Sequence, residues 1–159
     1  MTSTRTAPTL AEALGFRISR VARLRRQQWA RQLQTLDLTT GEAAVLRALV
    51  EAPGIALRPL TRLLGSEVMK VRRSVDALER RGLVRTAADP DDQRLRTLWL
   101  TADGRTTARR VQAIVNENEA VLAQVLGDRG YRDLMRLLDR LEPALLADDA
   151  DDLTTTTAR

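Results

Sequence analysis

The sequence predicts a mainly α-helical protein of the α+β class, and three observations lead to this fold class. Apolar residues recur at three- and four-residue steps over most of the chain, which is the period of amphipathic helices. The pattern becomes strand-like only between residues 83 and 100, where a short hairpin is expected. The longest striped segments, 10–36 and 106–146, stand at opposite ends of the sequence. We therefore expect a small mixed core flanked by long terminal helices.

The N-terminal segments supply the first of these long helices. Residues 1–9 are rich in Thr, Ser and Pro, so we expect a disordered terminus. Residues 10–36 are predicted to form one helix, which would be marginal alone in water and is expected to pack against other helices of a dimer. Its apolar side is made of Leu10, Leu14, Ile18, Val21, Leu24, Trp29 and Leu33.

Two shorter helices follow. Thr39 and Glu42 have the spacing of a capping box, and the Ala-Pro-Gly at 52–54 ends the helix that they open. Ile55 and Leu57 are predicted to form a very short strand that pairs with the hairpin. The expected inward side chains of the first helix are Ala43, Leu46, Leu49 and Val50. Those of the next are Leu60, Leu63 and Leu64.

A further helix begins after a tight turn at Gly65, with Ser66 as its expected N-cap. Gly82 ends this helix, and Arg80 and Arg81 are expected to interact with its C-terminal end rather than with bases. The predicted buried stripe is Val68, Val71, Val75 and Leu78. The basic residues that fall off the stripe are Lys70, Arg72 and Arg73.

The hairpin comes next, with strands predicted at 83–86 and 96–100. In the turn between them, Asp92 and Arg94 are expected to point to the same side and form an ion pair that stiffens the tip. Thr101 is expected to cap the following helix. A helix, a turn, a second helix and a hairpin with a basic tip form the outline of a winged helix, a module that reads duplex DNA.

Two segments resemble the MarR family of regulators. The run DQRLRTLWLTADGR, which ends at Arg105, resembles the wing signature, and RSVDALERRGLV resembles the end of the recognition helix. The resemblance implies a homodimeric, ligand-responsive bacterial transcription regulator in which Asp92 braces the wing and Arg94 enters the minor groove. The chain departs from the family at Gln93, where a basic residue is common, and at Glu67, where a small hydroxyl residue is usual.

The C-terminal third is predicted to form two helices, 106–126 and 131–146, joined by a turn at 127–130. Asn118 interrupts the apolar stripe of the first, and it either fixes the helix register from a buried position or is simply exposed. The expected division of the chain is a disordered terminus at 1–9, a dimerisation helix at 10–36, a winged helix-turn-helix DNA-binding domain at 37–105, dimerisation helices at 106–147 and a disordered tail at 148–159.

Composition argues against several classes of function. The chain has 159 residues, a net charge of +5, and neither cysteine nor histidine. Disulfides, thiol-based sensing, nearly all zinc sites and nucleophilic triads are thereby excluded, and paired apolar-flanked carboxylates are missing too. We therefore expect no enzyme, no catalytic residue, no metal and no cofactor. The sequence shows neither a membrane-spanning run nor a signal peptide, so we expect a cytoplasmic protein without a membrane partner.

The candidate binding residues are arginines and their neighbours. The predicted DNA-binding residues are Ser66, Lys70, Arg72, Arg73, Arg94 and Arg96, with Asp92 as the wing brace. The competing interpretation of the helix cations is a solvated helix face. Trp29, with Arg20 and Arg23, is the predicted wall of an effector pocket, because an aromatic ring beside arginine suits a planar anion such as an anionic aromatic compound. If Leu98 and Leu100 alternate with Trp99, that indole faces outward.

The resulting hypothesis is a ligand-responsive repressor that binds a pseudo-palindromic operator in double-stranded DNA as a homodimer. The alternative is a winged-helix module for non-specific DNA coating or for protein contact. The ratio of specific to non-specific affinity separates the two. A small enzyme is the third hypothesis, and carboxylates with strongly raised pKa values in a pocket would favour it.

Overall fold

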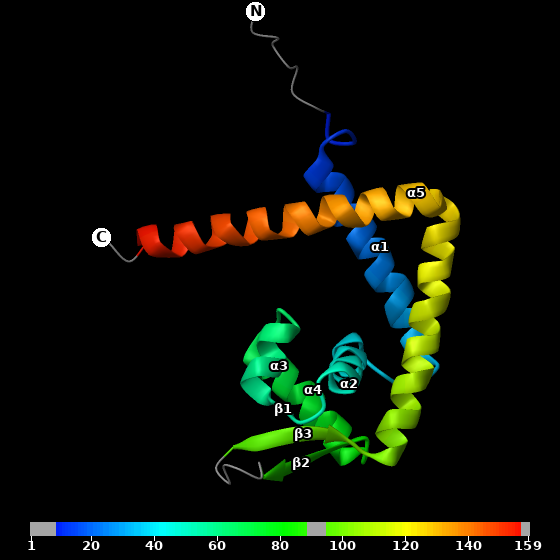
Figure 1. The fold of residues 1–159 in the computed structure, drawn as a ribbon, viewed down its shortest axis with the longest axis vertical. Coiled ribbons are helices and arrows are strands. Elements are labelled where there is room, and N and C mark those ends of the chain that lie inside the picture. The colour runs from blue at the N-terminus through cyan, green and yellow to red at the C-terminus, as the bar shows by residue number, and fades with distance from the viewer. Residues whose placement is uncertain (1–8, 89–94, 157–159) are drawn as a thin grey trace, which may run out of the picture. The chain divides into compact units, whose positions relative to one another are not determined.

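A computed structural model describes residues 9–88 and 95–156, with side chains up to residue 146 (Figure 1). The chain forms two units, residues 1–113 and 114–159. The elements of the first unit are α1 (Leu14–Gln34), α2 (Thr40–Glu51), β1 (Ile55–Ala56), α3 (Leu57–Leu63), α4 (Val68–Arg80), β2 (Val84–Ala88), β3 (Arg96–Leu100) and the first turns of α5 (Ala102–Thr156).

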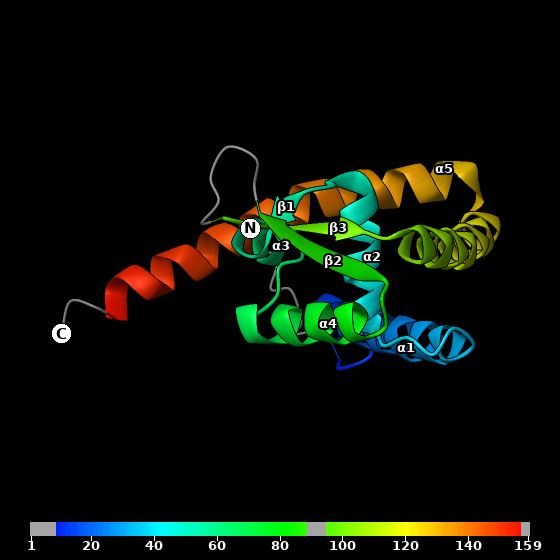
Figure 2. The same ribbon diagram turned by 90° about the horizontal axis from the view of Figure 1, so that it is seen from below.

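The three strands form one antiparallel sheet in the order β1-β3-β2. Ile55 lies opposite Leu98, and Val84 lies opposite Leu100. The predicted pairing of a very short strand with the hairpin is confirmed, although Leu57 begins α3 instead of extending that strand. Helix α4 packs beside β2 and against α2 and α3 (Figure 2). The helix-turn-helix and the hairpin thus share one core.

That core draws a side chain from almost every element. The largest fully buried residues are Leu33, Leu46, Leu49, Leu60, Leu78, Val45 and Val111. Because Val111 and Ala108 come from α5, the first unit extends beyond the predicted domain boundary at 105. Val50, Leu63 and Val68 were expected to face inward but are about half exposed, because each lies at an end of its helix, where the packing surface runs out.

Local sequence signals explain most helix ends. Thr39 and Glu42 form the predicted capping box, since each side chain accepts a hydrogen bond from the other residue's main-chain N–H. Gly65 and Gly82 have positive φ angles of 54° and 68°, as their turn positions require. The Ser66 prediction was wrong. Glu67 is the N-cap of α4, and its side chain makes no cap hydrogen bond.

The two predicted C-terminal helices are present, and α5 joins them across a break in helical geometry at Gly127, with φ 67° and ψ 159°. The break involves this one residue instead of the expected 127–130. The second helix continues to Thr156, past the expected start of the tail at 148. Asn118 is buried, which excludes the exposed alternative. Across the kink, the Tyr131 hydroxyl donates a hydrogen bond to Glu119 Oε2 at 2.7 Å.

Among the described residues, no helix is long and apolar enough to cross a membrane. The same residues contain no group of three acidic side chains placed to hold a metal ion.

Candidate nucleic-acid interface

Helix α4 has a buried face and a charged outward face. Val71, Val75 and Leu78 anchor the helix in the core. At 100° per residue the opposite side must point away from the protein. The exposed residues on and beside this outward face are Met69, Lys70, Arg72, Arg73, Asp76 and Arg80. Three predicted DNA-binding residues, Lys70, Arg72 and Arg73, therefore lie on one accessible surface.

Two of these cations are paired with acids of the same helix. Lys70 Nζ lies 2.6 Å from Glu67 Oε1, and Arg72 Nε lies 3.4 Å from Asp76 Oδ1. The hydrogen bond from Lys70 lowers the pKa of the Glu67 carboxyl, which is therefore charged at neutral pH. Both pairs are exposed, and exposed pairs are weak. DNA phosphate therefore competes with these acids for the cations, which the acids partly neutralise.

The structure brings the helix and the hairpin together at one groove. Arg72 of α4 and Arg96 of β3 both line a groove of about 130 Å³. Ser66 and Lys70 line a second groove of about 290 Å³ at the turn between α3 and α4. Arg96 is exposed, and it is the second described residue after the gap at 89–94. Asp92 and Arg94 lie outside the described residues.

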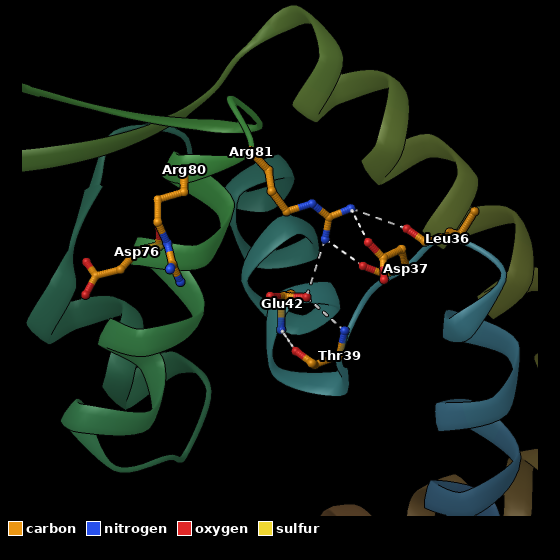
Figure 3. A network of polar contacts seen from close by, with 7 residues as sticks. All are labelled: Leu36, Asp37, Thr39, Glu42, Asp76, Arg80 and Arg81. Atoms are coloured by element: carbon orange, nitrogen blue, oxygen red, sulfur yellow. Dashed lines mark hydrogen bonds and ion pairs between the residues drawn. The ribbon is translucent and has the colours of Figure 1, made fainter.

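Arg81 occupies a different environment, which the sequence did not predict (Figure 3). Its guanidinium donates to the Asp37 carbonyl at 2.6 Å and to the Leu36 carbonyl at 3.5 Å. The same group lies 3.7 Å from Glu42 Oε2 and 3.8 Å from Asp37 Oδ2. Among the described residues, the neighbouring Arg80 donates a hydrogen bond only within its own helix, to the Asp76 carbonyl. Arg81 thus ties the end of α4 to the segment between α1 and α2.

A pocket of about 500 Å³, called the Trp99 pocket below, opens between the end of α2, strand β3 and the start of α5. Its lining residues are Leu49, Val50, Pro53, Trp99, Leu100, Arg105 and Arg109. Trp99 is partly exposed while Leu98 and Leu100 are buried, so the predicted alternation is confirmed. The indole N–H donates to Thr97 Oγ1 at 3.0 Å, and the Arg85 guanidinium carbon lies 5.7 Å from the ring centroid. These contacts hold the indole in position.

The three residues predicted to form an effector pocket all lie on α1. Arg20 and Arg23 are exposed, and Trp29 is partly buried against the core. None of the three lines the Trp99 pocket.

Comparison with known proteins decides the family. A family model described as MarR family matches residues 38–95. The HTH-type transcriptional repressor Rv2887 of Mycobacterium tuberculosis is 31% identical over 129 residues, which cover 80% of this chain and 92% of that protein. The chain belongs to the MarR family. The transcriptional regulator HosA of Escherichia coli O111:H- is 39% identical over 77 residues, covering 48% of this chain and 56% of HosA.

Solved structures of MarR-family proteins have the same fold. The transcriptional repressor CouR, bound to a 23-mer DNA duplex, has a TM-score of 0.78 and 28% identity, with 88% of this chain and 99% of that chain covered. The PcaV regulator from Streptomyces coelicolor, in complex with its natural ligand, has a TM-score of 0.74 and 27% identity over 89% and 99% of the two chains. The predicted winged-helix fold is confirmed, and this MarR-family chain is a DNA-binding transcriptional regulator.

Proposed function

We propose that this regulator represses transcription by binding a pseudo-palindromic operator as a homodimer, with α4 in the major groove. The observation that carries the proposal is the outward face of α4, where Lys70, Arg72 and Arg73 project from a helix held in the core on its other side. CouR, which is similar over nearly its whole length, was solved on a DNA duplex. Basic residues on a core-anchored recognition helix are suited to phosphate and base contacts.

Exposed apolar side chains on the long helices support the dimer. Along one side of α1 and just before it they are Leu10, Leu14, Ile18, Val21 and Leu24. On the second half of α5 they are Leu134, Leu137, Leu145 and Leu146. Isolated exposed apolar residues are ordinary, but a continuous row along a helix marks an interface. A twofold dimer would present two copies of α4 about 34 Å apart, on successive major-groove faces.

The wing completes the proposed contact. We propose that Arg94 reaches the flanking minor groove, that Asp92 braces the tip, and that Arg96 contacts phosphate from β3. Ser66 contacts phosphate from the turn before α4. Arg72 and Arg96 line the same groove, so helix and hairpin meet the duplex as one surface.

An effector would bind most favourably in the Trp99 pocket. This pocket combines apolar walls, an indole and the guanidinium groups of Arg105 and Arg109, which suit a small planar anion with an aromatic body. We propose it in preference to the surface around Arg20, Arg23 and Trp29. The pocket lies between the hairpin and the start of α5. A bound ligand would therefore favour one arrangement of the DNA-binding domain relative to the dimerisation helices.

Footprinting and binding titrations on the protein's own upstream region test the proposal. The expected result is a protected, twofold-symmetric site. Its affinity should exceed that for unrelated duplex at the same salt by about a thousandfold or more, as for other specific regulators. Equal affinity for unrelated duplexes would support the non-specific coating alternative instead. Sedimentation at the working concentration should show a dimer, and a monomer would overturn the proposed twofold arrangement of the two α4 helices.

The effector site has a separate test. With Trp29→Phe, Trp99 becomes the sole tryptophan reporter, since the chain has two tryptophans. Benzoate is expected to change its fluorescence and benzamide, which is neutral, is not. Arg109→Gln should remove the response while Arg110→Gln, an exposed neighbour that does not line the pocket, keeps it. A response that survives Arg109→Gln would remove the site from the pocket.

A further inference from the structure

The outward face of α4 carries one large apolar side chain among its charges. Met69 is 64% exposed and lies in the first turn of the helix. At 100° per residue it lies about 160° around the helix from Val71, about 120° from Val75 and about 40° from Arg73 one turn later, so it faces away from the core. Arg73 Nε donates to the Met69 carbonyl at 3.3 Å, which places its guanidinium beside the same turn. An uncharged thioether is therefore surrounded by groups suited to phosphate.

The neighbouring charges show what Met69 can meet. Lys70 pairs with Glu67 and Arg72 pairs with Asp76, and at 100° per residue the two cations lie on either side of Met69 around the helix. Val68, 47% exposed, adds a second apolar surface at the same helix end. In the family's docking geometry, the first turn of the recognition helix faces the base edges and its flanks face the backbone. An apolar centre with a basic rim matches the chemistry of a major groove approached in this orientation.

Only one major-groove group is apolar. The 5-methyl of thymine is the single hydrocarbon substituent among the donors and acceptors of the four base pairs. The unbranched, polarisable side chain of methionine adapts readily to such a small group. We infer that Met69 reads the 5-methyl groups of thymine, so that each operator half-site has an A·T pair beneath the first turn of α4.

This inference rests on the proposed function, because it requires α4 in the major groove. The expected change in affinity follows from the apolar surface that the methyl group buries. Burying one methyl group is worth about fourfold in affinity, so two symmetric half-sites are worth about fifteenfold. The inference predicts which chemical feature of the operator is read and which side chain reads it.

The test begins by selecting an operator from a random duplex library with the full-length protein. The thymines of the selected sequence are then replaced by deoxyuridine one symmetric pair at a time, which removes only the methyl group. One pair is expected to weaken binding of the unchanged protein by about fifteenfold. The same substitution should have no effect on Met69→Gln, which keeps the length of the side chain but not its apolar character. Met69→Leu, of similar volume and apolar, should retain the penalty.

The outcomes separate this inference from the function beneath it. If no sequence is selected over random duplex, the proposed function fails and the inference fails with it. If a specific operator binds equally well with thymine and uracil, the function stands and the methyl contact is overturned. A uracil penalty that persists in Met69→Gln also overturns it, because another residue must then read the methyl group. Unchanged affinity of Met69→Gln for every duplex would mean that this side chain meets something other than DNA.

Discussion

The guanidinium of Arg81 donates a hydrogen bond to the main-chain carbonyl of Asp37, with 2.6 Å between Nη1 and O. Arg81 is the C-cap of α4, and Asp37 lies in the connection between α1 and α2, where its φ of 53° is unusual for a residue with a side chain. One side chain therefore joins the end of the recognition helix to the segment that leads from the long N-terminal helix. The position of α4 depends on this link as well as on its apolar face.

Removing the link should destabilise the protein measurably. Arg81→Ala leaves the largely buried Glu42 carboxylate without its cation and two carbonyls without a donor. Hydrogen bonds to charged groups contribute about 1.5–3 kcal/mol, so urea unfolding should show a loss in that range. Arg80→Ala is the matched control, because Arg80 is exposed and its hydrogen bond among the described residues stays within α4. This change should alter stability by less than about 0.5 kcal/mol. Equal losses in the two variants would contradict the assigned role of Arg81.

Gly104, the glycine of the wing signature, is required by a close approach between α5 and the main chain at Leu83. A Cβ at Gly104 would lie 1.9 Å from the Leu83 carbonyl oxygen, which is main chain and cannot swing aside. Gly104→Ala must therefore push α5 away from the start of β2, and we expect a loss of about 1–3 kcal/mol by thermal or urea unfolding. Gly15→Ala, also in a first helical turn but with nothing within 4 Å, should be neutral or gain up to about 1 kcal/mol. A neutral Gly104→Ala would show that α5 is not fixed by this close approach.

Tyr131 provides a pH-dependent readout of the kink in α5. Its hydroxyl donates to the Glu119 carboxylate, and this hydrogen bond, followed by the charge of Glu119, raises the pKa of the phenol above its ordinary value of 10.0. The stabilisation is present while the phenol is protonated and is lost as pH rises through the raised folded-state pKa. Since the chain has a single tyrosine, its absorbance titration reports this group alone. Glu119→Gln should lower the midpoint, whereas Glu117→Gln should not; an unchanged midpoint in Glu119→Gln would exclude the contact in solution.

Local signals allowed much of the fold to be predicted from the sequence. The capping box of Thr39 and Glu42 and the N-cap of Thr101, whose Oγ1 accepts from the Gly104 N–H at 3.0 Å, involve residues only three apart. The alternation around Trp99 follows from strand geometry. Such features depend on neighbours along the chain, and the sequence contains them directly.

The features that could not be predicted depend on distant partners. The Asp37 carbonyl lies 44 residues from Arg81 in sequence, and nothing in either segment signals their contact. The Trp99 pocket needs α2, β3 and α5 together. At 127–130 the two glycines correctly indicated a break between two helices, but not its extent, because only Gly127 leaves helical geometry.

Glu67 should limit DNA affinity, and removing its charge is expected to strengthen binding. Its carboxylate stands at the start of the recognition helix, where it repels phosphate, and it holds Lys70 at 2.6 Å. The hydrogen bond from Lys70 lowers the pKa of Glu67, so the repelling charge persists to lower pH than in an unpaired glutamate. Glu67→Gln removes that charge and releases Lys70 for a phosphate contact.

Salt titrations distinguish this effect from a general change in net charge. One additional phosphate contact per subunit should steepen the slope of log Kobs against log salt by about 0.9, or about 1.8 for a dimer. Glu117→Gln makes the same change in net charge at an exposed position on α5 and should leave the slope unaltered. If both variants gain affinity equally without a change in slope, the pairing of Glu67 with Lys70 does not control the phosphate contacts of α4. A steeper slope in Glu67→Gln alone would mean that the free protein holds one of its DNA-binding cations in reserve within the recognition helix.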